Sequence, residues 1–242
     1  MRKLIFIPLT LLTALTVWST WNSIFASLHG DSNYNDMLSV ILCNIPYIME
    51  ANLSVSPLTL ISSMYYILIV CLGTAFVYTN SMAYPYNYSS MVLLRFGSRG
   101  KYLKQSLLRN LMASAQFCTF IAAILFLCQL PLLKNPGSQW TAWSHTEEVK
   151  WYLMQALKMI LFFHTAGTLG EFLRRQFHET SAVIILVLTA ALITIIDILS
   201  KETSIITFTA ESTQLWRIGI FIVIDGILIL LCRKYLFSAM DT

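Results

Sequence analysis

Six long apolar segments constrain this chain more than any other feature of its sequence. They cover approximately residues 4–25, 58–79, 110–133, 151–170, 181–199 and 215–232. Each approaches the length of about 20 residues that an α-helix needs to cross the hydrocarbon core of a bilayer. Only 12% of the 242 residues are charged, whereas a soluble domain usually carries about 25%. We therefore expect an all-α polytopic membrane protein, with residues 1–242 forming a single transmembrane domain.

Local signals accompany the first two segments. Met1-Arg2-Lys3 precedes the first one, as in a signal peptide, but the apolar run that follows is longer than a typical signal-peptide core. We expect a retained signal-anchor helix there. Ser56 and Pro57 suit the N-cap and the first helical position, so the second helix should begin at Pro57.

The distribution of Lys and Arg predicts the orientation of the chain. Eleven of the 16 basic residues fall on one side of the six segments: Arg2, Lys3, Arg95, Arg99, Lys101, Lys104, Arg109, Arg174, Arg175, Arg233 and Lys234. The other side has Lys134, Lys150, Lys201 and Arg217. Because cytoplasmic loops carry an excess of Lys and Arg, both termini and the 80–109 loop should be cytoplasmic.

The longest outer loop, residues 26–57, contains the apolar stretch MLSVILCNIPYIM at 37–49. This stretch is too short to span a bilayer and is interrupted by Pro46. It could be an interfacial helix lying on the outer leaflet or a re-entrant segment that lines a substrate exit.

Sequence motifs of several enzyme classes are missing. The chain has no G-x-x-x-x-G-K-[ST], no H-E-x-x-H and no G-x-S-x-G. Glu147-Glu148 resembles the paired glutamates of Abi-type intramembrane proteases, but the string continues EEVKW without the arginine that family needs. Two acids at a helix N-terminus are the simpler interpretation. We expect no catalytic residue, no metal site and no cofactor bound by this chain.

The remaining composition points the same way. The five cysteines follow no metal-ligand spacing, and most lie in or beside apolar segments, so we expect no disulfide framework. The basic residues interrupt apolar runs and do not form a continuous soluble face. We therefore expect a lipid bilayer and no nucleic acid among the partners.

Ionisable residues inside the membrane are candidates for function because burying them is costly. Lys158 and Asp225 lie at similar depths in the fourth and sixth segments, so an interhelical pair between them is possible. Alternatively, Lys158 extends outward and Asp225 bonds to a neighbouring hydroxyl. His164, with Gln116, Gln129 and Gln155, is expected to form interhelical hydrogen bonds and not to relay protons.

The stretch LLRFGSRGKYLKQSLLRNL at 93–111 contains five cations and no acid. From Gly100 onward, Leu103, Leu107 and Leu111 recur at helical spacing beside the cations. This pattern predicts a short amphipathic cytoplasmic helix leading into the third span. Such a helix could hold the loop against anionic lipid or dock onto a cytoplasmic partner.

Six spans, cytoplasmic termini, the string Leu94-Arg95-Phe96-Gly97-Ser98-Arg99 and an amphipathic helix entering the third span resemble the membrane subunits of ABC-2-type exporters. The resemblance is closest to small permeases of Gram-positive bacteria that export antimicrobial or cytolytic peptides. It implies a multi-pass protein of a bacterial plasma membrane. It also implies that the amphipathic helix is a coupling helix that docks onto a separate ATP-binding subunit.

Carried over to this sequence, the coupling-helix contacts would be Arg95, Phe96, Arg99, Lys101, Tyr102 and Lys104. A lesser cytoplasmic contact would involve Arg174, Arg175 and Phe177. Two ATPases, which bind ATP and Mg, would work with two permeases, either identical or homologous. The other classes that fit the sequence are an ion-coupled secondary transporter, an intramembrane enzyme and an immunity protein that binds a toxin.

Overall fold

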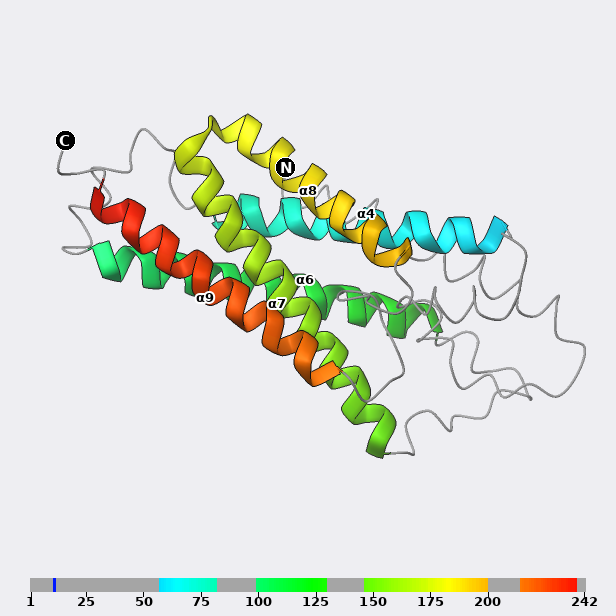
Figure 1. Cartoon of the computed structure of the whole chain (residues 1–242). Coiled ribbons are helices and arrows are strands. Elements are labelled where there is room, and N and C mark those ends of the chain that lie inside the picture. Colours follow the sequence, from blue (N-terminus) through cyan, green and yellow to red (C-terminus); the bar gives the residue numbers. More distant parts are fainter. Residues whose placement is uncertain (1–10, 12–56, 82–98, 130–145, 200–213, 239–242) are drawn as a thin grey trace, which may run out of the picture. The chain divides into compact units, whose positions relative to one another are not determined.

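The computed structural model describes residues 11, 57–81, 99–129, 146–199 and 214–238. These residues form five α-helices and no strand (Figure 1): α4 (Pro57–Ser81), α6 (Arg99–Gln129), α7 (Thr146–Gln176), α8 (Glu179–Leu199) and α9 (Gln214–Ser238). The expectation of an all-helical chain is confirmed for this part of the protein. The first expected span, apart from residue 11, and the segment 37–49 lie outside the described residues.

Each of the five described helices overlaps one of the six predicted spans, and the start of α6 differs most from the predicted bound. α4 begins at Pro57, as the proline at the first helical position predicts. α6 begins at Arg99, well before the predicted start of the third span at residue 110. The basic amphipathic segment and the span are therefore one continuous helix. Leucines at helical spacing run from one into the other, and no glycine or proline interrupts them after Gly100.

Two helices of the described residues are long and apolar enough to cross a membrane, over Gly100–Ile124 in α6 and Glu179–Asp197 in α8. The α8 helix also leaves large apolar side chains uncovered, and Leu188, Leu192 and Ile196 are each more than half exposed. A lipid environment would cover such a surface. The membrane assignment thus has support from two helices, while six spans and the single transmembrane domain stay predictions.

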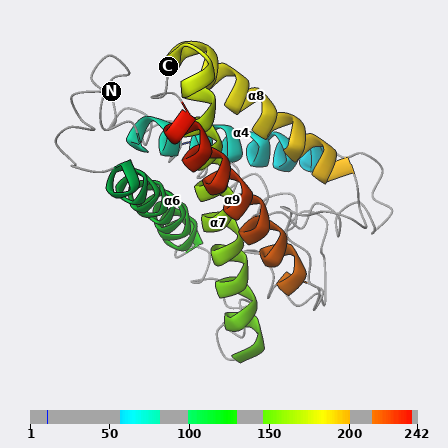
Figure 2. The same cartoon turned by 60° about the vertical axis from the view of Figure 1, so that its left-hand side comes forward.

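Contacts between the helices divide the chain into two compact units. One comprises residues 1–70, 119–156 and 193–212, and the other comprises residues 71–118, 157–192 and 213–242. The second unit holds residues 71–81 of α4, 99–118 of α6, 157–176 of α7, 179–192 of α8 and all of α9. Figure 2 shows the five helices from a second direction. Every contact described below lies within this second unit.

In the second unit α7 packs against α4, α6, α8 and α9. Residue numbers on α7 rise together with those on α4, since Phe163 meets Gly73 and Gly167 meets Val77. They also rise together with those on α9, where the contacts are Phe162 with Phe221, His164 with Asp225 and Thr168 with Cys232. Its contacts with α6 run in reverse, from Phe117–Phe163 to Tyr102–Glu171. α4, α7 and α9 are therefore parallel and α6 is antiparallel to them. The predicted alternation of the spans requires these directions.

The core of this unit is built on aromatic rings and close helix approach. Phe117 of α6 contacts Phe76 of α4 and Phe163 of α7, with ring centroids 5.7 and 5.2 Å apart. Gly73 allows α4 to pack this closely on the Phe163 ring, because a Cβ at position 73 would lie 2.4 Å from that ring. Small residues at helix interfaces let backbones approach in this way.

Candidate functional site

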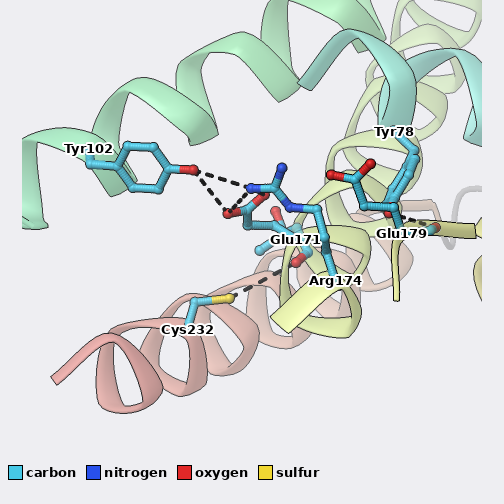
Figure 3. Close-up of polar contacts among 7 residues, drawn as sticks. Tyr78, Tyr102, Glu171, Arg174, Glu179 and Cys232 are labelled. Carbon is cyan, nitrogen blue, oxygen red and sulfur yellow. Dashed lines mark hydrogen bonds and ion pairs between the residues drawn. The ribbon is translucent and has the colours of Figure 1, made fainter. Parts of the chain in front are cut away.

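The helix ends that were predicted to be cytoplasmic meet at one end of the second unit. Figure 3 shows the residues that join them: Tyr78 of α4, Tyr102 of α6, Glu171 and Arg174 of α7, Glu179 of α8 and Cys232 of α9. The apolar packing beneath them includes Leu103, Phe172 and Cys232, so the start of α6 also meets the ends of α7 and α9.

Tyr102, Glu171 and Arg174 form a buried polar cluster, which we call the brace. The Tyr102 hydroxyl donates to Oε1 of Glu171 at 3.4 Å and accepts from Nη2 of Arg174 at 3.3 Å. Nη2 of Arg174 also lies 3.1 Å from each carboxylate oxygen of Glu171. Glu171 and Arg174 are three residues apart on α7, a spacing that places side chains on one helix face. The brace thus ties the start of α6 to the end of α7.

Burial makes the brace electrostatically strong. The side chains of Arg174 and Glu171 are only 6% and 5% exposed. Burial by itself would lower the pKa of Arg174, but the neighbouring Glu171 carboxylate and Tyr102 outweigh it and raise that pKa. Arg174 therefore keeps its positive charge, and the pair acts as a fixed ionic contact.

A second contact joins α4 to α8 at the same end of the unit. The hydroxyl of Tyr78 donates to the backbone carbonyl of Glu179, the first residue of α8, at 3.3 Å. Its ring is buried with Ala182 and Leu186. Gly170 of α7 makes room for it, because a Cβ there would lie 2.5 Å from the Tyr78 ring.

The predicted docking residues divide into two groups. Lys101 and Lys104 are exposed on α6, and Phe177, just after α7, is 48% exposed. We call Lys101, Lys104 and Phe177 the docking surface. Arg95 and Phe96 lie outside the described residues, as do the side chains of Arg99 and Arg175.

Tyr102 and Arg174 were expected to contact a partner, but their polar groups face each other and Glu171 inside the chain. Arg174 is 6% exposed, so we assign it a bracing role and not a docking role. Glu171 was not among the site residues predicted from the sequence. Its spacing of three residues from Arg174 in the string EFLRRQ could have indicated an ion pair on one helix face.

The ionisable residues in the interior of the helices are also placed. Nδ1 of His164 lies 3.0 Å from Oδ2 of Asp225, and its Nε2 lies 3.3 Å from the carbonyl oxygen of Leu107. The prediction that His164 makes interhelical hydrogen bonds is confirmed. Lys158 is fully buried. The side chain that the structure places against Asp225 is His164, and the pairing of Asp225 with Lys158 stays a prediction.

The described helices contain no group of three or more His, Cys, Asp or Glu residues that could hold a metal ion. No protein-family model, curated protein or solved structure matches the chain. The functional argument therefore depends on the residues and their geometry.

Proposed function

We propose that the chain is the membrane-spanning permease subunit of an ATP-driven exporter and is powered by a separate ATP-binding subunit. The observation that carries this proposal is the brace. It joins Tyr102, in the basic start of α6, to Glu171 and Arg174, near the end of α7. These are the two segments for which contact with an ATPase was predicted. A displacement of either the basic start of α6 or the end of α7 is therefore transmitted to both helices.

The length of α6 supports the same proposal. Its 31 residues make a helix of about 46 Å, whereas the hydrocarbon core is about 30 Å thick. The helix can cross the bilayer and still extend its basic start beyond the surface. Because the helix is unbroken, a shift of that start moves the span as a rigid body.

In this proposal the chain itself carries no catalysis. Two permeases, either identical or homologous, work with two ATPases that bind ATP and Mg. Closure of the ATPases moves the docking surface, and the spans reorient around a cargo of amphipathic or antimicrobial peptide, lipid or drug.

Two observations test the proposal: whether an adjacent reading frame encodes a P-loop ATPase, and whether such an ATPase co-purifies with the chain. We expect binding to be lost when Lys101 and Lys104 are changed to Glu, and also when Arg95 and Arg99 are changed to Glu. Lys234→Glu is the matched control, because Lys234 is exposed near the end of α9 and lies outside the docking surface. Undiminished recruitment of the ATPase by both double variants at normal salt would refute the proposal.

An ion-coupled secondary transporter is the second candidate, and the buried His164–Asp225 pair favours it. Ionisable residues within apolar helices often lie on ion pathways. Transport by the chain alone in vesicles, driven by an ion gradient and without ATPase, would support this candidate and exclude the first.

A further inference from the structure

His164 lies between two oxygen atoms that belong to different helices. Oδ2 of Asp225 on α9 is 3.0 Å from Nδ1, and the carbonyl oxygen of Leu107 on α6 is 3.3 Å from Nε2. The His164 side chain is 10% exposed and the Asp225 side chain is 14% exposed. Three helices therefore meet at one histidine ring.

The number of protons at this contact follows from hydrogen-bond chemistry. The Leu107 carbonyl can only accept, so Nε2 of His164 must carry a proton. The contact between Nδ1 and Asp225 then needs a second proton, either on the ring nitrogen or on the carboxyl oxygen. Neutral histidine beside an ionised aspartate has only one. With that single proton, one ring nitrogen would be unprotonated, and its lone pair would point at a lone pair of the facing oxygen atom. That contact would be repulsive.

Further buried polar atoms adjoin the same contact. Oδ1 of Asp225 and both polar atoms of the Asn110 side chain are buried without a hydrogen-bond partner in the described part of the chain. Asn110 is one turn beyond Leu107 on α6. It packs against Gly167, where a Cβ would lie 3.0 Å from its amide carbon, and Gly167 is close to one turn beyond His164 on α7. The second oxygen of the Asp225 carboxyl group is thus left without a partner in the described part of the chain, where it can hold a proton.

The other charged residues of α6, α7 and α9 lie at other positions along these helices than the His164 contact. On α7, Lys158 is buried two turns before His164, and Glu171 is bound to Arg174 two turns after it. On α6, Arg109 follows Leu107 and is half-buried, and on α9, Arg217 is buried two turns before Asp225. The contacts that the structure gives the His164 ring nitrogens are Asp225 and the Leu107 carbonyl.

We infer that His164, Asp225 and the Leu107 carbonyl form a proton-binding site that holds α6, α7 and α9 together. While the extra proton is bound, both contacts of His164 are satisfied. When it leaves, the ring keeps one contact and loses the other, which weakens the attachment of α7 to either α6 or α9. The ligand is a proton, and its release loosens a junction between three helices. This inference is independent of whether an ATPase or an ion gradient drives the chain.

Nuclear magnetic resonance of the full chain in lipid nanodiscs counts the protons directly. The chain has four histidines, and the His164 signals in a sample labelled with ¹⁵N-histidine are assigned by their loss in His164→Gln. While both contacts of His164 are made, we expect two protons at the pair. They appear either as a doubly protonated ring or as an Nε2–H ring beside a protonated Asp225 carboxyl, which its ¹³C shift reports. A neutral ring beside an ionised Asp225 in the folded chain would overturn the inference.

Thermal unfolding in detergent gives a second measurement. An exposed histidine has a pKa of about 6.5, so an unfolded chain above about pH 7.5 lacks the extra proton. The folded wild type binds one proton more, and its folding equilibrium constant should fall by up to tenfold per pH unit as the pH rises. In Asp225→Asn the amide can donate to Nδ1 while Nε2–H still binds Leu107, so the slope should be smaller than in the wild type by the contribution of this one proton.

Asp197→Asn is the control, because Asp197 is a buried aspartate of α8 outside the site. It should keep the wild-type slope. Equal slopes in the wild type and Asp225→Asn would overturn the inference. If Asp225→Asn does not fold, the proton count of the wild type decides the question alone.

Discussion

Removing both charged partners of the brace should destabilise the chain by less than the sum of the two single removals. At the observed separation of 3.1 Å, the attraction between Arg174 and Glu171 is about 5 kcal/mol for an effective dielectric constant of about 20. Desolvation of the two ions, at several kcal/mol each, offsets this gain. Arg174→Met removes the attraction but leaves the Glu171 carboxylate buried. We expect a loss of about 3–5 kcal/mol in the free energy of unfolding.

The double variant Glu171→Leu, Arg174→Met removes both the attraction and the buried charges. It should therefore lose less than the sum of the two single variants, with a coupling of about 1–3 kcal/mol. Chemical unfolding in mixed detergent measures all four free energies. Lys104→Met is the control, since its cation is exposed on α6, and it should change stability by less than about 0.5 kcal/mol. A mild effect of Arg174→Met, or strict additivity in the double variant, would show that the brace is not a coupled buried pair.

Three further substitutions test the packing, each by the same unfolding measurement. Gly170→Ala places a methyl group 2.5 Å from the Tyr78 ring and should cost about 1–3 kcal/mol through overpacking; an unchanged free energy would show that the ring moves aside freely. Tyr78→Phe loses the hydrogen bond to the first carbonyl of α8 and should cost about 1 kcal/mol, and a larger loss would mean that the ring is displaced. Phe163→Ala leaves a cavity in the aromatic core and should cost about 3–5 kcal/mol. The matched change Leu188→Ala, at a side chain that is 58% exposed on α8, should have a much smaller effect, and equal losses would contradict the assigned core.

Much of the helical framework could be predicted from the sequence, because apolar length and helix-start chemistry are local properties. Pro57 opens α4 where its fixed backbone angle suits the first helical turn. The amphipathic helix predicted from Gly100 and the span predicted from residue 110 were treated as separate elements, because only the apolar part was counted as span, whereas α6 runs through both. A helix does not end at the membrane surface, and the basic residues before position 110 continue it.

Side-chain partners were harder to predict, because depth in the membrane does not fix rotation about a helix axis. Counted from the sequence, Lys158 and Asp225 had similar depths, but the contacts of Phe162 with Phe221 and of His164 with Asp225 place Lys158 six residues, or about 9 Å along α7, before the level of Asp225. At about 100° per residue, those six residues also turn Lys158 and His164 to different faces of α7. The face of α7 that meets α9 carries Phe162 and His164, so Asp225 meets the histidine. The inward direction of Arg174 was equally hidden, since a string of charged residues at a helix end ordinarily suggests a solvated surface.

The unbroken α6 helix has a mechanical consequence. Phe117 is held between Phe76 and Phe163 and can serve as a fulcrum. Tyr102 lies fifteen residues away on the same helix, a lever arm of about 22 Å at 1.5 Å per residue. A sideways displacement of about 2 Å at the basic end then tilts the whole helix by about 5°. A small motion at the basic end of α6 is in this way converted into a rotation of the helix about the contact of Phe117 with Phe76 and Phe163.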